Sequence, residues 1–300
     1  MEETSAVKPL ITINISNAAE EQWDLVIEPK ARLLSLNLKE VWHYRDLLWL
    51  FVKRDFSAQY KQTILGPLWH IIQPVFTTLV FLLVFGEIAN IPTDGIQPKI
   101  LFYMSGITLW NYFSACLTAT SNTFVANAGI FGKVYFPRLV IPLSTVMSNM
   151  VKFGIQFCLL LAVMSWFGLK NNHFHFGLSW LLIPLLVAMM AGLGLGLGIV
   201  ISSLTTKYRD FNVLIGFAVQ LLMYATPVAY PLSFLKGKYY AAWIAWNPLT
   251  PIIEVFRYAL FGAGTADATG LALSGAFIVV VLVAGMLIFS KVERTFMDTV

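Results

Sequence analysis

Six long apolar stretches mark this chain as a membrane protein. They cover residues 68–89, 100–125, 139–168, 178–203, 212–230 and 270–290. Each holds about 20 residues or more, the length that a helix rising about 1.5 Å per residue needs to cross roughly 30 Å of hydrocarbon. The pattern predicts an all-α integral membrane protein with six transmembrane helices.

An amphipathic helical pattern precedes the first stretch. From residue 35 onward, apolar side chains such as Trp42 recur at helical spacing, with charged side chains such as Arg45 and Arg54 between them. Such a helix lies in the membrane interface, although a helix packed on a second soluble domain would give the same pattern. We expect an N-terminal amphipathic interfacial helix with its connector over 35–64. The polar residues 1–34 form a separate cytoplasmic segment, either a small hairpin or irregular.

Residues 231–263 break the pattern of full-length spans. Two apolar segments, Tyr239–Trp246 and Ile252–Phe261, lie on either side of a Pro-containing link. Each is too short to cross the bilayer, so they are expected to form an outer re-entrant helix pair between spans five and six. Two further crossings would give eight spans with the same sidedness, and only their length argues against this. The transmembrane domain is expected to cover 65–300.

Composition and charge support lipid burial and set an orientation. The chain is 58% hydrophobic and 12% charged, against roughly 25% charged in soluble domains. One set of loops and the tail carry ten basic residues: Arg45, Lys53, Arg54, Lys61, Lys133, Arg138, Lys207, Arg209, Lys291 and Arg294. The opposite side carries five: Lys99, Lys170, Lys236, Lys238 and Arg257. The positive-inside rule therefore predicts cytoplasmic N- and C-termini, and the absence of a long basic run argues against nucleic-acid binding.

No sequence pattern for catalysis or metal binding is found. His173 and His175 have no Cys or carboxylate neighbours in sequence, as a metal site would need. The Gly-Lys pairs at Lys133 and Lys238 lack the other P-loop residues. We therefore expect no metal, no cofactor in this chain and no enzymatic activity of its own.

The entry to the first span carries the most specific motif. It runs through Val52-Lys53-Arg54-Asp55-Phe56, Tyr60-Lys61-Gln62-Thr63, Leu65-Gly66-Pro67-Leu68-Trp69 and Gln73-Pro74. Gly66 permits a sharp turn and Pro67 suits the first position of a helix. An ordinary charged anchor before a membrane helix is the alternative interpretation.

Taken with other short motifs in order along the chain, this entry resembles a known family. The other motifs are Leu36–Arg45, Phe131–Arg138, Asn247-Pro248-Leu249-Thr250 with Glu254 and Arg257, and Glu293-Arg294-Thr295-Phe296. Together they resemble the permease subunits of type-2 ATP-binding-cassette exporters for bacterial polysaccharides, which include O-antigen, capsule and teichoic-acid exporters. The resemblance extends from about residue 35 to the end.

The resemblance implies a half-transporter in the bacterial inner membrane. Two copies would form a homodimer with two copies of a separate nucleotide-binding subunit, which would bind ATP and Mg²⁺ and drive export of a lipid-linked polysaccharide. The residues expected at the interface and entry are Trp42, Arg45, Arg54, Tyr60, Lys61, Gly66 and Trp69. The alternatives are an exporter of a small lipid or drug, an ATP-independent carrier or channel, and a membrane enzyme acting on lipid-linked sugars.

The segment between spans two and three is expected to contact the ATPase. The resemblance makes it a coupling helix in which Phe131, Tyr135 and Phe136 dock and Lys133 and Arg138 steer. A plain loop anchored by its two basic residues is the alternative.

Aromatic side chains are candidates for the sugar pathway. Trp110 and Tyr112 lie in the second span, and Trp243 and Trp246 lie on the re-entrant segment. Their faces could stack on sugar rings, although an aromatic belt at the membrane interface explains each residue individually.

Charged and small residues within the apolar regions give further hypotheses. Glu254 and Arg257 are three positions apart, so on a helix they face the same way and pair, either at an exit gate or as a structural ion pair. Lys152 lies deep in span three and must face the bundle or snorkel. Four glycines in span four, Gly192, Gly194, Gly196 and Gly198, predict close helix packing.

Overall fold

The computed structural model describes residues 38–61, 63–131, 133–134, 136–171, 177–205, 208, 210–235, 237–239 and 241–296. All of them belong to one compact unit, Leu36–Val300, and its regular elements within these ranges are helical. The N-terminal segment 1–34 lies outside the described residues. The division into domains therefore stays a prediction.

The first span begins where the sequence predicts. Gly66 has a φ of +47° and Pro67 follows it in the first turn of η1 (Gly66–Leu68). The helix continues as α3 (Trp69–Phe81) and the π-helical η2 (Leu82–Ile88), giving an apolar stretch of 23 residues. The left-handed turn at Gly66 separates this span from the helix before it.

Four more helices are long and apolar enough to cross a membrane. They are α4 (Lys99–Ser121), α6 (Val140–Asn171), α7 (Ile183–Thr205), which follows η3 (Leu178–Leu182), and α11 (Ala268–Phe296). With the first span they make five candidate spans. Each corresponds to an apolar stretch predicted from the sequence.

The fifth predicted stretch, 212–230, is corrected at its end. Its helix, α8 (Phe211–Tyr224), has 14 residues, about 21 Å at 1.5 Å per residue. The chain leaves the helix at Ala225, two residues before Pro227, which has no N–H for a helical hydrogen bond. This helix alone is shorter than the hydrocarbon layer.

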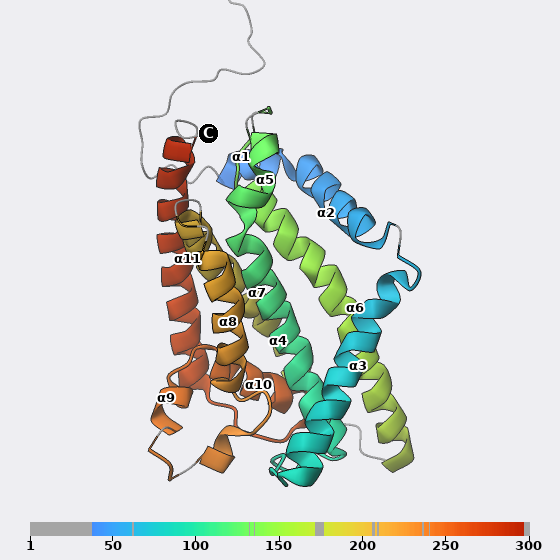
Figure 1. The fold of residues 1–300 in the computed structure, drawn as a ribbon. Helices are drawn as coiled ribbons and strands as arrows, with labels where there is room; N and C mark the ends of the chain where they lie inside the picture. The colour runs from blue at the N-terminus through green and yellow to red at the C-terminus, as the bar shows by residue number, and fades with distance from the viewer. Residues whose placement is uncertain are drawn as a thin grey trace, which may run out of the picture. The chain divides into compact units, whose positions relative to one another are not determined.

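Short helices gather at the two ends of the bundle (Figure 1). At one end lie α1 (Leu38–His43), α2 (Arg45–Tyr60) and α5 (Thr123–Phe131). At the other lie η4 (Leu232–Leu235), α9 (Ala241–Ala245) and α10 (Leu249–Phe261). We call these the α2–α5 end and the α9–α10 end. The helices α9 and α10 occupy the two apolar segments that the sequence predicts to be too short to cross.

The core forms around α7, which packs between α4 and α11. A Cβ on Gly198 would lie 2.6 Å from the Cβ of Thr120 in α4, and one on Gly196 would lie 3.0 Å from Cγ1 of Val281 in α11. Gly194 faces α4 and Gly192 faces α11 in the same way. The predicted close packing is confirmed, with each small-residue pair facing a different helix.

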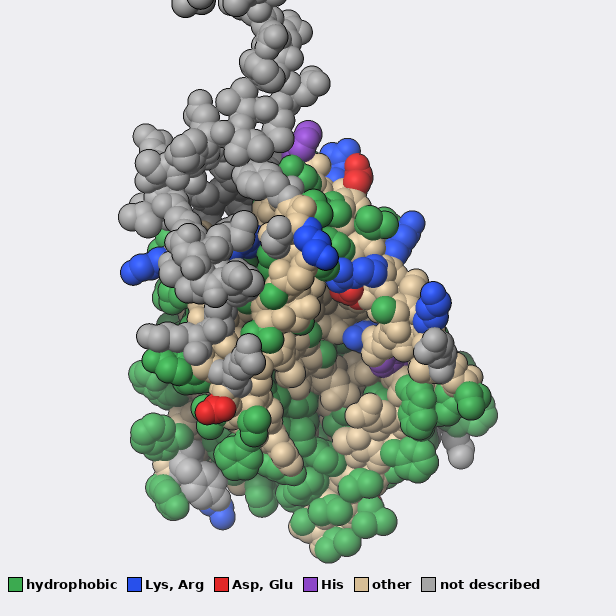
Figure 2. Space-filling view, turned by 45° about the horizontal axis from the view of Figure 1, so that its top comes forward, with side chains coloured by type: hydrophobic (Ala, Val, Ile, Leu, Met, Phe, Trp, Pro, Cys, Tyr) green, Lys and Arg blue, Asp and Glu red, His purple; other side chains and the backbone are tan. Residues whose placement is uncertain are grey.

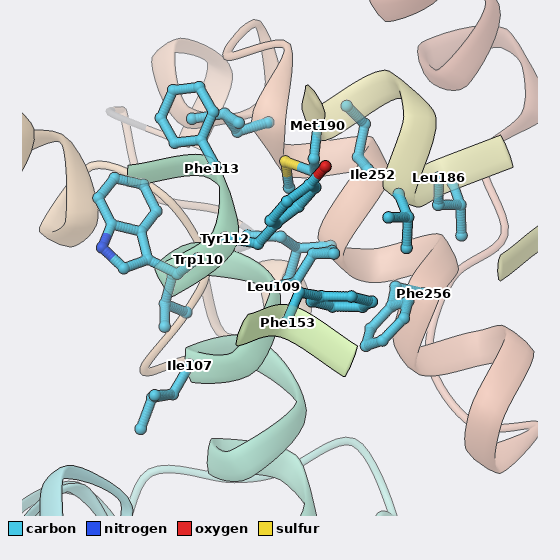
Figure 3. Close-up of a cluster of buried hydrophobic side chains, with 14 of the residues drawn as sticks. Ile107, Leu109, Trp110, Tyr112, Phe113, Phe153, Leu186, Met190, Ile252 and Phe256 are labelled. Atoms are coloured by element: carbon cyan, nitrogen blue, oxygen red, sulfur yellow. The ribbon is translucent and has the colours of Figure 1, made fainter. Parts of the chain in front are cut away.

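Large apolar side chains from four helices meet in this core (Figure 3). Phe113 of α4, Phe153 of α6, Met190 of α7 and Phe256 of α10 are all buried there. Helix α10 is therefore an internal element of the bundle rather than a surface appendage.

Candidate functional site

Five phenylalanines join the helices of the α2–α5 end into one cluster. This phenylalanine cluster consists of Phe51 in α2, Phe124 and Phe131 in α5, Phe136 in the following loop and Phe289 in α11. The ring centroids of Phe51 and Phe136 are 5.8 Å apart, and those of Phe131 and Phe136 are 6.0 Å apart. Because the rings are buried together, α2 and the loop between α5 and α6 are held by the same contacts.

The predicted docking role of Phe131 and Phe136 is corrected. The two side chains are 4% and 5% exposed, so neither ring is free to enter a groove of another protein. Arg138 is buried as well, and its guanidinium carbon lies 5.3 Å from the ring centroid of Phe131. These side chains hold the loop against its own chain, because the apolar partners that bury them come from α2 and α11.

Two residues of this loop do face outward. Lys133 and Val134 are exposed at its tip, directly after α5. Tyr135 lies outside the described residues. Among the described residues of this loop, the surface offered to a partner is therefore Lys133 and Val134, with the rings of Phe131 and Phe136 buried.

The predicted entry residues divide into exposed and inward-facing groups. Trp42, Arg45, Arg54, Lys61 and Trp69 are exposed. Arg54 lies over the ring of Phe51 at 4.6 Å and pairs with Asp55 at 2.8 Å. Tyr60, at the end of α2, packs edge-on against His70 of α3 with ring centroids 5.6 Å apart, and burial raises the pKa of its hydroxyl. This contact fixes α2 to the start of the first span, across the turn at Gly66.

Charge on the surface follows the same division of the molecule. Lys and Arg side chains gather at the α2–α5 end, while hydrophobic side chains cover most of the remaining described surface in this view (Figure 2). Exposed aliphatic and aromatic residues on α3 and α8, such as Phe76 and Phe217, belong to that apolar surface. The arrangement suits a helix bundle in lipid with one strongly basic end.

A polar pocket of about 260 Å³ lies between α3, α4 and α6. Its polar lining comes from His70, Gln73, Asn111, Tyr112, Ser114, Thr118, Asn149, Lys152 and Gln156. Lys152 thus faces the interior of the bundle, one of the two orientations that the sequence left open.

The two predicted pathway aromatics of the second span have different surroundings. Tyr112 lines the polar pocket and packs against Phe153 at 5.1 Å. Trp110 is buried in the hydrophobic core, where its ring meets that of Phe113 at 5.5 Å (Figure 3). In this structure only Tyr112 of the two borders open space.

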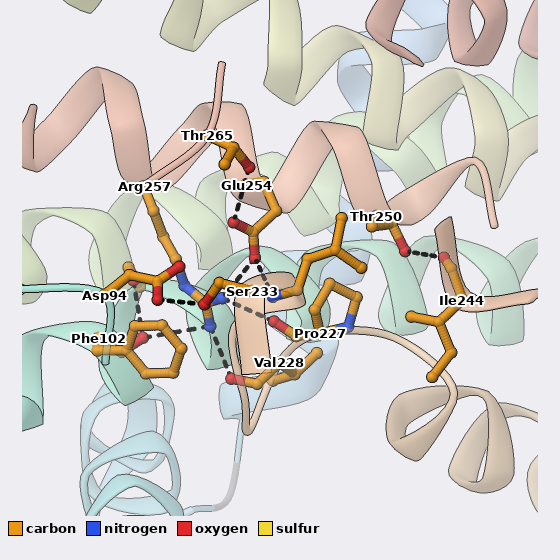
Figure 4. A network of polar contacts seen from close by, with 12 residues as sticks. Asp94, Phe102, Pro227, Val228, Ser233, Ile244, Thr250, Glu254, Arg257 and Thr265 are labelled. Carbon is orange, nitrogen blue, oxygen red and sulfur yellow. Dashed lines mark hydrogen bonds and ion pairs between the residues drawn. The ribbon is translucent and has the colours of Figure 1, made fainter. Parts of the chain in front are cut away.

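At the α9–α10 end, Glu254 and Arg257 form the predicted ion pair. The Arg257 Nη1 atom lies 3.5 Å from Oε1 of Glu254, and both side chains are buried (Figure 4). Arg257 also donates to the carbonyls of Pro227 and Val228, each at 2.7 Å. Its guanidinium lies 3.7 Å from the ring centroid of Phe102 in α4. The pair therefore ties α10 to α4 and to the segment that follows α8.

The two tryptophans near α9 remain available at the surface. Trp243 is 82% exposed and Trp246 is 89% exposed. The segment after α8 holds the turn between α9 and α10, because the Asn247 amide donates to the Ala225 carbonyl at 3.1 Å and to Thr226 Oγ1 at 2.9 Å. Both an aromatic belt and a sugar-contacting surface are consistent with this exposure.

Comparison with known proteins identifies the family. A family model described as ABC-2 type transporter matches residues 46–261, which include the phenylalanine cluster except Phe289, the polar pocket and the buried ion pair. The chain belongs to the ABC-2 type transporter family. It is a multi-pass membrane protein of that family, and five helices among its described residues are long and apolar enough to span.

Several relatives of this ABC-2 chain carry functional names. The O-antigen export system permease protein RfbA of Klebsiella pneumoniae is 28% identical over 268 residues, covering 88% of this chain and 99% of that protein. RfbA of Myxococcus xanthus is 26% identical over 268 residues, covering 88% and 98%. The polysialic acid transport protein KpsM of Escherichia coli is 21% identical over 249 residues, covering 82% and 93%. The resemblance to polysaccharide-export permeases is confirmed.

Some features of this ABC-2 chain carry no local sequence signal. Besides Glu254 and Phe102, Arg257 meets two backbone carbonyls, which every residue possesses, so only the fold reveals which ones it meets. The pocket lining comes from three helices, and each contributes isolated polar residues among apolar ones. Lys152 alone carries a recognisable signal, a charge deep in an apolar span.

Proposed function

We propose that this chain is the membrane-spanning subunit of an ATP-driven exporter that moves a lipid-linked polysaccharide across the bacterial inner membrane. The observation that carries the proposal is the near full-length similarity to export permeases, which covers 93–99% of those proteins. The proposed complex is a homodimer with two copies of a separate ATPase subunit.

The proposed topology has six crossings and cytoplasmic termini. Helix α8 with the turn after it makes the sixth crossing, and α9 with α10 forms a re-entrant pair on the outer side. Two facts support this. The basic residues gather at the α2–α5 end, as expected of a cytoplasmic face. Helix α10 is buried against α4 and α7, which suits a non-spanning helix surrounded by protein.

The proposed coupling surface is the exposed tip of the loop between α5 and α6. Lys133 and Val134 would contact the ATPase, and the phenylalanine cluster would connect that contact to α2 and α11. Since Phe136 packs on both Phe51 and Phe131, a displacement of the tip would press on α2 through buried rings. Close packing transmits such a displacement because interiors have little free volume.

Co-purification tests the proposal directly. The tagged native chain, isolated from its own membrane in mild detergent, should bring a P-loop ATPase in roughly equal amount. The double variant Lys133→Glu with Val134→Asp should weaken that association by about tenfold or more, because it places negative charge where a basic residue stood.

The matched control is Lys238→Glu, an exposed lysine at the α9–α10 end. It should keep the ATPase. Recovery of the native chain without any ATPase would refute the exporter, whereas equal recovery by both variants would refute only the assignment of the coupling surface.

A further inference from the structure

The polar pocket between α3, α4 and α6 has an unbalanced positive charge. Lys152 lines it, and within the described ranges no Asp or Glu does. No described residue forms an ion pair with Lys152 either. Asp55 of α2 acts on it electrostatically but already pairs with Arg54 at 2.8 Å. A charge at membrane depth without a partner costs a few kcal/mol, so an anion is the ligand that this site favours.

The other lining groups supply hydrogen-bond donors around that charge. Ser114, Thr118, Gln73 and Asn149 carry hydroxyl or amide donors. The His70 Nε2 atom is buried without a hydrogen-bond partner. Oxygen atoms of a phosphate accept several such bonds at once, and charge-assisted bonds of this kind are the strong ones.

The position and size of the pocket indicate what bears the phosphate. Lys152 is 12 residues into α6 from Val140, about 18 Å along the helix from its α2–α5 end. A volume of about 260 Å³ is below the roughly 300–1,000 Å³ of sites that enclose a whole small molecule. Apolar side chains, including Phe76 of α3 and Met150 of α6, are exposed on the helices that form the pocket. This volume would suit a headgroup alone, with its lipid tail on the apolar surface outside.

We propose that this pocket binds the phosphate group of a membrane lipid, with Lys152 as its counterion. The phosphate could belong to a phospholipid or to the lipid that carries the exported glycan. Phosphate binding in this pocket does not depend on the proposed function. Only the assignment of the phosphate to the lipid that carries the exported glycan rests on it. Lys152 would hold the charge, and the amides and hydroxyls of α3, α4 and α6 would orient its oxygens.

Lipid binding to the purified native chain tests this proposal. The probes are phosphatidylglycerol, a polyprenyl diphosphate, inorganic diphosphate, and a diacylglycerol that has the same tails without phosphate. Lys152→Gln should weaken binding of at least one phosphate probe by about tenfold, the loss of one charge-assisted contact. The matched control Lys53→Gln removes an exposed lysine from α2 at the same end and should change binding less than twofold.

Two further measurements separate ligand binding from a structural role. Lys152→Arg, which keeps the charge, should retain binding. Lys152→Gln should melt no earlier than the native chain in phosphate-free detergent, because it removes an unpaired charge.

The pattern across probes identifies the source of the phosphate. A loss confined to the polyprenyl diphosphate identifies the carrier lipid, and a loss confined to phosphatidylglycerol identifies a phospholipid site. Equal binding of inorganic diphosphate would show that the lipid tail contributes nothing, and would overturn the lipid part of the proposal. Two outcomes would overturn the assignment of the site. In one, Lys152→Gln binds every phosphate probe as tightly as the native chain; in the other, it also loses binding of diacylglycerol, which has no phosphate. An absent ATPase in the co-purification leaves these results unaffected.

Discussion

Replacing Gly198 with alanine should loosen the contact between α4 and α7. The added methyl group would lie 2.6 Å from Cβ and 2.9 Å from Cγ2 of Thr120, and 3.2 Å from the Leu117 carbonyl oxygen. Backbone atoms of α4 cannot rotate away as a long side chain would. The helices must therefore separate locally, and α7 cannot retreat because Gly196 packs against α11 on its other side.

The size of the effect follows from two opposing terms. Overpacking a tight interior typically costs about 1–3 kcal/mol, and alanine gains up to about 1 kcal/mol over glycine in helix propensity. The net expected loss for Gly198→Ala is therefore up to about 2 kcal/mol. The matched variant is Gly216→Ala in α8, where nothing lies within 4 Å of the new methyl group, so it keeps the propensity gain. The difference between the two variants is the overpacking cost of about 1–3 kcal/mol, which corresponds to roughly 2–5 °C in midpoint for 300 residues at about 2.1 cal/mol/K per residue.

Heating in one detergent, followed by size-exclusion chromatography of the remaining folded protein, measures this difference. Gly198→Ala should lose half of its folded peak at a lower temperature than Gly216→Ala does. The double variant Thr120→Gly with Gly198→Ala removes the side chain that the new methyl group would meet. Its loss of stability should be smaller than the sum of the losses in the two single variants. If Gly198→Ala melts at or above Gly216→Ala, the packing argument is wrong.

Three other variants probe the two ends of the bundle. Arg257→Gln leaves Glu254 buried without its partner, so it should cost about 3–5 kcal/mol and abolish the folded peak; normal assembly with lost export would instead support a gate. Phe136→Ala should cost about 3 kcal/mol and reduce ATPase recovery, and undiminished recovery would contradict coupling through the phenylalanine cluster. Alanine at both Trp243 and Trp246 should reduce polysaccharide export while membrane abundance, measured by immunoblot, stays unchanged; normal export would remove them from the pathway.

Membrane crossing is the part of this fold most readily predicted from sequence. A span must be long and apolar because the bilayer has a fixed thickness, so the five long helices follow from counting residues. Where that requirement relaxes, prediction loses accuracy. The apolar pattern predicts a second span that reaches residue 125, but α4 ends at Ser121 and α5 begins at Thr123. The residues at the break, 120–123, are polar, and Phe124 beyond it is apolar because it is buried against its own chain.

The candidate site shows a similar limit. The spacing of Glu254 and Arg257 predicts their pairing because a helix brings positions i and i+3 together. By contrast, the sequence around an aromatic loop residue such as Phe136 is compatible both with docking on a partner and with packing inside its own chain. The outcome depends on Phe51, which is 85 positions earlier in the sequence. No local pattern contains that information.

Helix α6 joins the proposed coupling surface to the proposed lipid site. Its first residues, Val140 and Ile141, pack in the same hydrophobic cluster as Phe136, and Lys152 faces the pocket about three turns further along the same helix. If contact with the ATPase shifts α6, the phosphate affinity of the pocket must change. Linkage then requires that a bound phosphate change the affinity for the ATPase by the same factor. A lipid bound in this pocket would therefore change the affinity of the chain for the ATPase through α6, without any contact between the lipid and the ATPase.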